Sequence, residues 1–191
     1  MHRIFAPLAI AAALVSAPAA AATYAGAGAT IPDNSFTLST IEIADSFLIA
    51  DLNVLVSGVA HNYASDVELF LTKGNVTVQL YNRHAGNQYM RGDLAFDDQA
   101  TTSIASYTQG GAAAYIPFQA LAAFNGLDAA GTWTLKAADV SGGLSGSYAG
   151  WSLQFTEQAG VVPEPATWAM MIMGFGAAGA MMRQRRRLAA L

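Results

Sequence analysis

The chain has 191 residues and no cysteine, which fits one domain with targeting segments and excludes a disulfide framework, a thiolate nucleophile and cysteine-ligated zinc. Charge is uneven, because all 13 acidic residues but only four of the 9 basic residues lie within 33–164. That segment therefore has a net charge of −9. Such an acidic surface disfavours nucleic acid as a partner and suits calcium binding or simple solubility.

The first 22 residues have the three parts of a secretory signal peptide. Arg3 gives a positive start, an apolar run extends from Ile4 to Val15, and Ala20 and Ala22 form an A-x-A cleavage pattern. We predict export and removal of 1–22 by signal peptidase. An uncleaved anchor is the alternative, but the apolar run is short for a membrane span and is interrupted by proline, with Pro7 inside it and Pro18 after it.

Residues 23–30 are rich in glycine and alanine, and we expect a flexible leader there. The body, 31–157, then contains segments in which apolar and mostly polar residues alternate, as in strands with one buried face. The alternation places Trp133 and Trp151 at positions of the same parity as the apolar residues, and so on inward faces. The alternating segments are 51–56, 67–72, 76–81, 132–137 and 151–156.

Turn-forming residues separate these segments. Lys73-Gly74-Asn75 lies between two of them and predicts a hairpin. Only 118–124 has a helical pattern, which begins after a proline and ends at Asn125-Gly126. Many short strands and almost no helix predict an all-β fold, an antiparallel β-sandwich of jelly-roll type, with a barrel as the alternative.

A linker, 158–165, precedes a stretch from Ala166 to Met182 that carries no charge. As a helix this stretch would be roughly 25 Å long, at the short end of a transmembrane span. The arginine-rich tail 183–191 should stay in the cytoplasm, so the body should lie outside. The span contains a GxGxxG pattern, which we interpret as helix-packing small residues because no strand precedes it.

A Pro-Glu-Pro tripeptide stands just before this stretch, and a tryptophan and four arginines complete the pattern. Together they resemble the PEP-CTERM sorting signal of Gram-negative bacteria, over Val162 to Arg187. The resemblance implies recognition and removal of the tail by an exosortase-type membrane protease, after transient anchoring in the inner membrane. It implies delivery to the cell surface or an exopolysaccharide matrix. The residues that carry it are Pro163, Glu164, Pro165, Trp168, Arg183, Arg185, Arg186 and Arg187.

Five short motifs occur in order along Ile31 to Phe155, and the longest is DLNVLVSGVAHNYASDVELFLTKGNVTVQL from Asp51 to Leu80. Their order resembles the P domain, or homo B domain, of subtilisin-like proprotein convertases. The resemblance implies a jelly-roll sandwich of the kind that supports a catalytic domain. Ser65 stands where the family usually has glycine, 72–75 replaces its Ser-Pro-Gly-Thr turn, and we see no catalytic domain before the body.

The histidines of the body, His61 and His84, do not predict a catalytic site. No serine stands in a nucleophile context that would complete a triad. His61 matches a strand end of the P domain, which implies a structural role, and His84 lies in a polar segment. We therefore predict no catalytic residues. Arg91-Gly92-Asp93 spells an adhesion tripeptide, which we interpret as an ordinary turn.

Four aspartates, Asp66, Asp97, Asp98 and Asp139, lie in loops or at strand ends. Carboxylates gathered on the loops of a sandwich would suit Ca²⁺, the one cofactor that the sequence suggests. The alternative is that each aspartate caps a turn through its own backbone.

Three functions remain open at this point. We favour a non-catalytic surface or matrix protein that acts by binding, with exopolysaccharide as a candidate partner. The second is an accessory P domain for a separately encoded subtilisin-like serine endopeptidase. The third is a peptidase.

Overall fold

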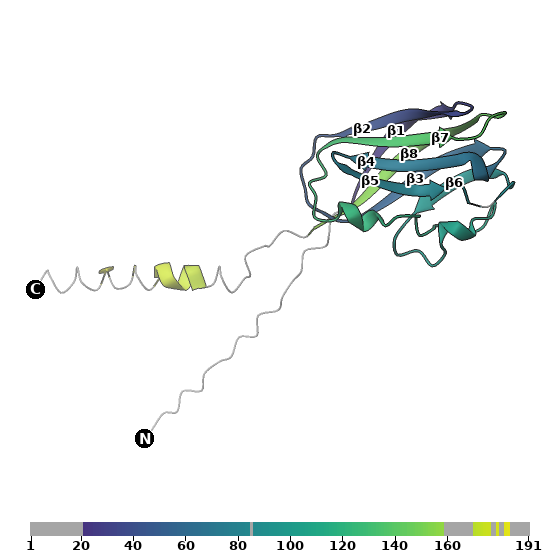
Figure 1. Cartoon of the computed structure of the whole chain (residues 1–191). Helices are drawn as coiled ribbons and strands as arrows, with labels where there is room; N and C mark the ends of the chain where they lie inside the picture. Colours follow the sequence, from purple (N-terminus) through teal and green to yellow (C-terminus); the bar gives the residue numbers. More distant parts are fainter. Residues whose placement is uncertain (1–20, 85, 159–169, 177–178, 180–181, 184–191) are drawn as a thin grey trace, which may run out of the picture. The chain divides into compact units, whose positions relative to one another are not determined.

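The computed structural model describes residues 21–84, 86–158, 170–176, 179 and 182–183. One compact unit, Ala19–Ala159, holds every strand, and the helical residues near the C-terminus belong to a separate unit. We call the strand-bearing unit the body (Figure 1).

Eight antiparallel strands form two four-stranded sheets (Figure 1). Within each sheet, most neighbouring strands are far apart in the chain, and only the β4–β5 pair is consecutive. All the remaining connections between consecutive strands cross from one sheet to the other. This topology is the eight-stranded jelly roll that the sequence predicts. The first sheet runs β1 (Ala21–Ile31), β8 (Gly146–Glu157), β3 (Ile49–His61), β6 (Met90–Phe96), and the second runs β2 (Ser35–Ile43), β7 (Gly131–Asp139), β4 (Val67–Lys73), β5 (Val76–Asn82).

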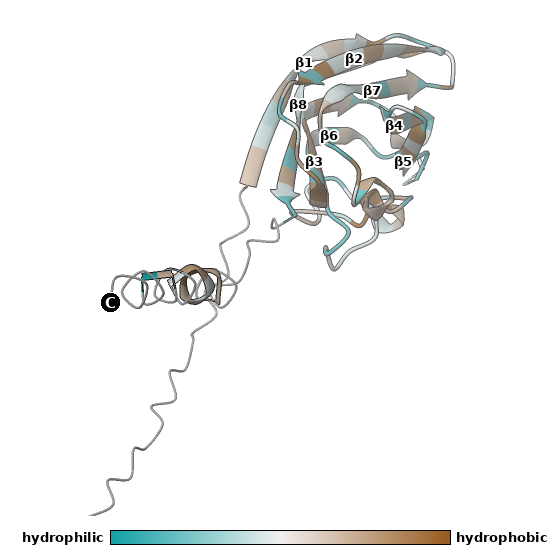
Figure 2. Cartoon of the chain, turned by 90° about the vertical axis from the view of Figure 1, so that its left-hand side faces the viewer, coloured by the Kyte–Doolittle hydropathy of each residue, from teal (hydrophilic) through white to brown (hydrophobic). Residues whose placement is uncertain are grey.

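The core lies between the sheets and is filled by the residues that alternate inward. Figure 2 shows hydrophobic and hydrophilic residues interleaved along the strands. Trp133 and Trp151 are buried, as their parity predicts. The Trp133 ring lies 5.4 Å from that of Phe155 and 5.0 Å from that of Phe124, and its indole N–H donates to the Ala129 carbonyl. Burying each such side chain contributes about 1.5–3 kcal/mol.

The predicted hairpin is present between β4 and β5. Lys73 pairs with Val76 across a two-residue turn. Gly74 has a φ of +54°, which glycine adopts without the steric cost that a side chain would add.

The expected flexible leader is wrong, because residues 23–30 lie within strand β1. This strand pairs with β8 from Ala21 to Ile31. Its small residues are required by packing: a Cβ at Gly26 would stand 2.3 Å from the Trp151 indole nitrogen, and a Cβ at Gly28 would stand 2.3 Å from the Ala149 carbonyl oxygen. The composition that suggests a loose segment is therefore that of a strand pressed against its neighbour.

The expected helix over 118–124 is largely wrong as well. Only one turn of 3₁₀ helix forms, η3 (Leu121–Phe124), and it buries Leu121 and Phe124. Two further 3₁₀ turns are η1 (Ala64–Asp66) and η2 (Ile104–Ser106). The apolar spacing that suggests a helix here serves to fill one edge of the core.

The predicted membrane span 166–182 lies only partly within the described residues. Residues 170–176, 179 and 182–183 are helical. Among the residues that the structure describes, no helix is both long enough and apolar enough to cross a bilayer.

Candidate functional site

The candidate site lies at one end of the sandwich, where three loops meet. These loops connect β3 to β4, β5 to β6 and β7 to β8. Strand β8 begins at this end of the sandwich with Gly146. It ends at Glu157, beside the start of β1. The site is therefore separated from the point where the chain leaves the body by the length of β8, on the order of 35–40 Å.

A buried histidine–carboxylate pair ties the two sheets together beneath these loops. His61 ends β3 and Asp139 ends β7, and both are 2% exposed. The Nε2–H of His61 donates to Oδ2 of Asp139 at 2.9 Å. Gly146 packs against the imidazole so closely that a Cβ there would stand 2.5 Å from Cδ2.

Both ring nitrogens of His61 have protein partners. Nδ1 lies 2.8 Å from the Tyr63 carbonyl oxygen and 3.2 Å from the Tyr63 nitrogen, while Nε2 is bonded to Asp139. Neither nitrogen is left to take a proton from a nucleophile, which a general base in a triad must do. The structural role expected for His61 is therefore what the contacts describe.

Main-chain hydrogen bonds fix the three loops relative to one another. Val140 N–H donates to the Asp66 carbonyl at 2.8 Å, and Ser141 N–H donates to Oδ1 of Asp139 at 2.9 Å. Ala64 N–H donates to the Gln88 carbonyl at 2.8 Å. The β7–β8 loop and the β5–β6 loop are thus each bonded through the main chain to the β3–β4 loop.

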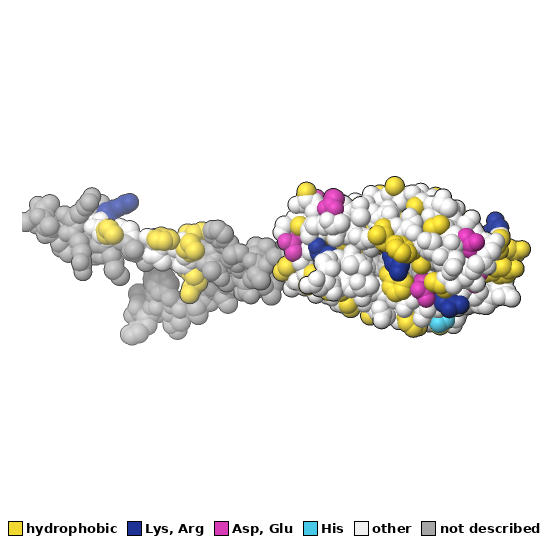
Figure 3. All heavy atoms as spheres, turned by 45° about the horizontal axis from the view of Figure 1, so that its top comes forward, with side chains coloured by type: hydrophobic (Ala, Val, Ile, Leu, Met, Phe, Trp, Pro, Cys, Tyr) yellow, Lys and Arg dark blue, Asp and Glu magenta, His cyan; other side chains and the backbone are white. Residues whose placement is uncertain are grey.

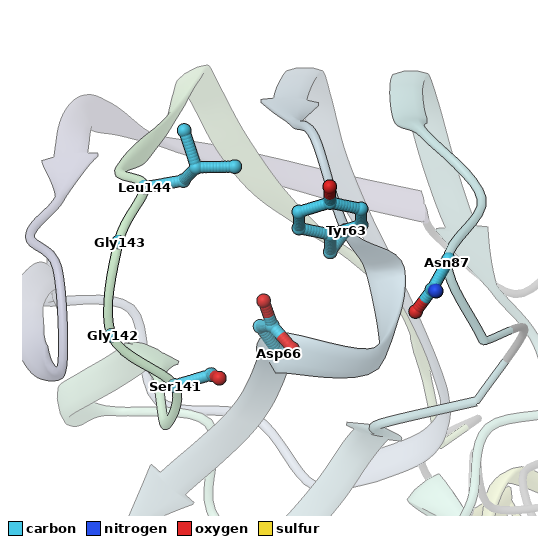
Figure 4. Close-up of a pocket in the computed structure, with 7 residues that line it drawn as sticks. All are labelled: Tyr63, Asp66, Asn87, Ser141, Gly142, Gly143 and Leu144. Atoms are coloured by element: carbon cyan, nitrogen blue, oxygen red, sulfur yellow. The ribbon is translucent and has the colours of Figure 1, made fainter.

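The loops enclose a shallow pocket of about 290 Å³, at the lower end of the ~300–1,000 Å³ common for small-molecule sites. Figure 4 shows Asp66 between the Ser141–Leu144 segment on one side and Tyr63 on the other, with Ser141 pointing toward it. The pocket is lined by Tyr63, Asp66, Asn87, Ser141, Gly142, Gly143 and Leu144.

Much of the hydrogen-bonding capacity of this lining is unused within the described structure. One carboxylate oxygen of Asp66, Oδ1, accepts from the Ser65 hydroxyl at 3.1 Å. The other oxygen has no partner among the described residues, and neither do the side chains of Tyr63, Asn87 and Ser141. Tyr63 is 41% exposed, so its ring is available to a ligand.

The structure does not gather the four aspartates proposed for calcium. Asp66 and Asp139 come to the pocket end, where Asp139 is buried against His61. Asp97 accepts from the Gln99 N–H at 2.7 Å, and Asp98 accepts from two N–H groups at the start of η3. Within the described parts of the chain, no three acidic, histidine or cysteine side chains are grouped as a metal would need. Calcium binding stays a prediction. The capping alternative describes Asp97, which bonds the backbone two residues on, whereas Asp98 caps the distant turn η3 and not a turn of its own.

The adhesion-like tripeptide lies in strand β6 rather than in a turn, so that expectation is corrected. Oδ1 of Asp93 accepts from the Gly58 N–H at 2.8 Å, at a bulge of β3 where Gly58 has a φ of +59°. The Arg91 guanidinium donates to Asn62 at 3.2 Å. Both charged side chains are therefore hydrogen-bonded within the body, Asp93 to β3 and Arg91 to the residue that follows β3.

The other histidine of the body, His84, is part of an aromatic cluster. Its ring lies 5.4 Å from that of Phe118, and the Tyr81 hydroxyl donates to its carbonyl oxygen. Burial raises the pKa of the Tyr81 hydroxyl well above its ordinary value.

The predicted processing residues lie mostly outside the described residues. This applies to Ala20, Pro163, Glu164, Pro165, Trp168, Arg185, Arg186 and Arg187. Arg183 is described and is helical. Ala22 pairs with Phe155 in β1, so cleavage after Ala22 would remove the first two residues of that strand.

Sequence reasoning missed most of the pocket. Of its lining, only Asp66 was singled out. Asn87 and Ser141 stand in polar loops outside the Asp51–Leu80 motif, and Tyr63 lies in that motif without a feature that marks it as a pocket residue. The one signal in the sequence was that Asp66 and Asp139 both stand at strand ends. This indicates the end of the sandwich where the pocket lies but not the chemistry of the pocket.

Charge does not mark another site on the face shown in Figure 3, where acidic and basic side chains are scattered. On the outer side of the second sheet, Phe36 and Leu38 are 52% and 57% exposed. The Lys136 ammonium lies 4.9 Å from the Phe36 ring and 5.2 Å from the Phe70 ring. This cluster is a lysine ammonium attracted to the faces of two aromatic rings.

Comparison with solved structures finds several matches to this chain, among them two structures of a serine protease and one of FLHE. A serine protease of Aeromonas sobria, solved in complex with its chaperone, is 18% identical, with a TM-score of 0.45 over 74% of this chain and 28% of that chain. The same protease solved alone is 17% identical, with a TM-score of 0.44 over 73% and 27%. FLHE is 10% identical, with a TM-score of 0.41 over 74% and 99%. This chain thus spans little more than a quarter of the protease chains that it matches.

No curated protein matches the sequence. A family model does match its C-terminal part, over residues 161–187, and that family is described as the PEP-CTERM protein-sorting motif. The match contains the tripeptide, the tryptophan and the arginines from which the sequence predicts this signal. The chain is therefore a jelly-roll body followed by a PEP-CTERM protein-sorting motif.

Proposed function

We propose that this protein is exported, sorted by its PEP-CTERM motif to the cell surface or an exopolysaccharide matrix, and acts there by binding. The observation that carries the proposal is the sorting motif at 161–187, directly behind a folded body. A membrane protease of the exosortase type would recognise the motif and release the body from the inner membrane. The signal peptide expected at 1–22 supports the first step, export.

The polar pocket of the body supports a binding function. His61 is bonded at both ring nitrogens, which makes this histidine unsuited to act as a general base. The pocket lies across the sandwich from the end that continues to the sorting motif. A ligand there would be held by loops that processing of either chain end leaves intact.

The second candidate function is an accessory domain for a separately encoded subtilisin-like protease. The ordered motifs of a P domain between Ile31 and Phe155 favour it. It differs from the first proposal in its partner, because it requires a stable complex with a protease. Co-purification of such a protease with the processed body from the native host would favour this second candidate.

The sorting step is tested by replacing Pro163, Glu164 and Pro165 together with alanine. We expect the variant to keep its arginine tail and to stay in the inner membrane, whereas the wild-type body is released. Gln158→Ala, just outside the motif, is the matched control and should be released normally. Immunoblots of membrane and extracellular fractions with antibodies against the body and against the tail measure both outcomes. Normal release of the triple variant would contradict the proposal.

A further inference from the structure

The pocket at the far end of the sandwich combines polar groups of both hydrogen-bonding kinds with two apolar side chains. The Asp66 carboxylate accepts hydrogen bonds, the Asn87 amide both donates and accepts, and the Ser141 hydroxyl does either. Tyr63 adds an exposed ring with a polar tip, and Leu144 is 36% exposed at the opposite wall.

We propose that this pocket binds a neutral saccharide, an inference that rests on the proposed function as a binding protein. Each sugar hydroxyl both donates and accepts, so it can use the free oxygen of Asp66 and the amide of Asn87 together. The C–H faces of a sugar ring are apolar and would pack against Tyr63 and Leu144, which stand on different loops.

Charge selects neutral sugars over acidic ones. Asp66 is the one ionisable carboxylate in the lining, and the lining contains no lysine or arginine. A uronate or sulfate group entering the pocket would meet this carboxylate without a cation to offset the repulsion. Hydrogen bonds from neutral sugar hydroxyls to an ionised carboxylate are among the stronger ones available.

The pocket is also fixed before a ligand arrives. The buried His61–Asp139 pair and the Val140–Asp66 main-chain bond hold the walls in place from behind. Gly143 N–H donates to Oδ1 of Asp33 at 2.8 Å, which ties the β7–β8 loop to the β1–β2 turn. Walls that are already ordered lower the entropy cost of binding a small polar ligand.

The test uses the full chain in a detergent without a sugar headgroup. Neutral hexose oligosaccharides of gluco-, galacto- and manno-configuration are titrated by calorimetry, with uronate-containing oligosaccharides as the anionic counterparts. We expect at least one neutral sugar to bind, and the matching uronate to bind at least about tenfold more weakly.

Variants assign the binding to the pocket. Tyr63→Ala and Asp66→Asn should each weaken neutral-sugar binding about tenfold or more. Asp66→Asn should also reduce the preference over the uronate, a change that a merely structural role would not produce. Tyr89→Ala is the matched control, because Tyr89 is an exposed tyrosine, at 54%, that does not line the pocket.

Neutral-sugar binding that both pocket variants leave unchanged, no saccharide binding at all, or tighter binding of the uronate would each overturn the inference. The sorting test distinguishes this from failure of the proposed function. A body that is released to the surface but binds no sugar would contradict only the saccharide assignment. A body that binds the sugar through Tyr63 and Asp66 but stays uncut in the inner membrane would contradict only the sorting proposal.

Discussion

At the scale of single residues, the contacts of the pair His61 and Asp139 differ from those of a catalytic triad. A histidine and an aspartate at 2.9 Å are two parts of a triad, yet here both are buried. The second nitrogen of His61 faces the Tyr63 backbone, where a nucleophile would have to stand. The pair joins the ends of β3 and β7, so we expect it to act on stability and on the position of the loops above it.

We expect His61→Ala and Asp139→Ala each to lower the free energy of unfolding by about 3–5 kcal/mol, because each leaves a buried partner uncompensated. The double variant should lose clearly less than the sum of the two, since both partners are then absent. Chemical denaturation of the four proteins measures the cycle. Additive losses, within about 0.5 kcal/mol, would show that the two side chains are not coupled.

A second residue-scale prediction concerns Asp128, whose carboxylate accepts from the Ala130 N–H at 3.0 Å and the Ser46 hydroxyl at 2.8 Å. These bonds, the backbone one first, lower the pKa of the Asp128 carboxyl below its ordinary value of 3.8. A lowered folded-state pKa stabilises the fold above the ordinary value, and this contribution is lost as the pH falls through the folded value.

Asp128→Asn should therefore be less stable than wild type at pH 6, and the gap in melting temperature should close as the pH falls below about 4. Thermal melts from pH 6 to pH 2 measure the gap. Glu42→Gln, at an exposed carboxylate of β2, is the matched control. A gap that widens toward low pH would contradict the assigned contacts.

At the scale of elements, strand β1 is the part of the fold that the sequence hides. Glycine and alanine are poor strand formers, so 23–30 has no strand pattern of its own. The strand forms because its ten pairs with β8 supply backbone hydrogen bonds and its glycines let Trp151 and Ala149 approach. This close approach is a property of two segments that are more than a hundred residues apart in the chain.

Gly26→Ala should lower the free energy of unfolding by about 1–3 kcal/mol, because the new methyl group overlaps the Trp151 ring and Ile41. Ala25→Ser, at the exposed neighbour of Gly26, is the control and should change the stability by less than about 0.5 kcal/mol. Chemical denaturation measures both variants. Equal stability of Gly26→Ala and wild type would contradict the close packing of β1 and would favour the expectation of a flexible leader at 23–30.

Other strands could be predicted from the sequence, and there is a physical reason why they could be predicted and β1 could not. The strands around Trp133 and Trp151 alternate over 132–137 and 151–156 because one face is buried and the other is more exposed, which the alternation in the sequence reports directly. The jelly-roll class also follows from many short strands separated by turns. The pocket was not predictable, because its lining comes from three loops that the topology brings together only at the end of the sandwich.

At the scale of the whole molecule, the points where the chain enters and leaves the body lie at one end of the sandwich, and the pocket lies at the other end. The first residue of β1, Ala21, pairs with Thr156 near the end of β8, whereas Gly146 at the start of β8 packs against His61. The chain thus enters and leaves the body at one end and offers its polar pocket at the other. This arrangement suits a body that is processed at both termini while the loops around its pocket stay intact.

The most direct test of this account is the intact mass of the protein recovered from its native host, in membrane and extracellular fractions. The account predicts a mass that begins near Thr23 and ends in the region of Pro163–Pro165, found outside the membrane. A mass that retains Arg183 to Leu191, found in the inner membrane, would contradict it, because the tail would then be a permanent anchor rather than a sorting signal.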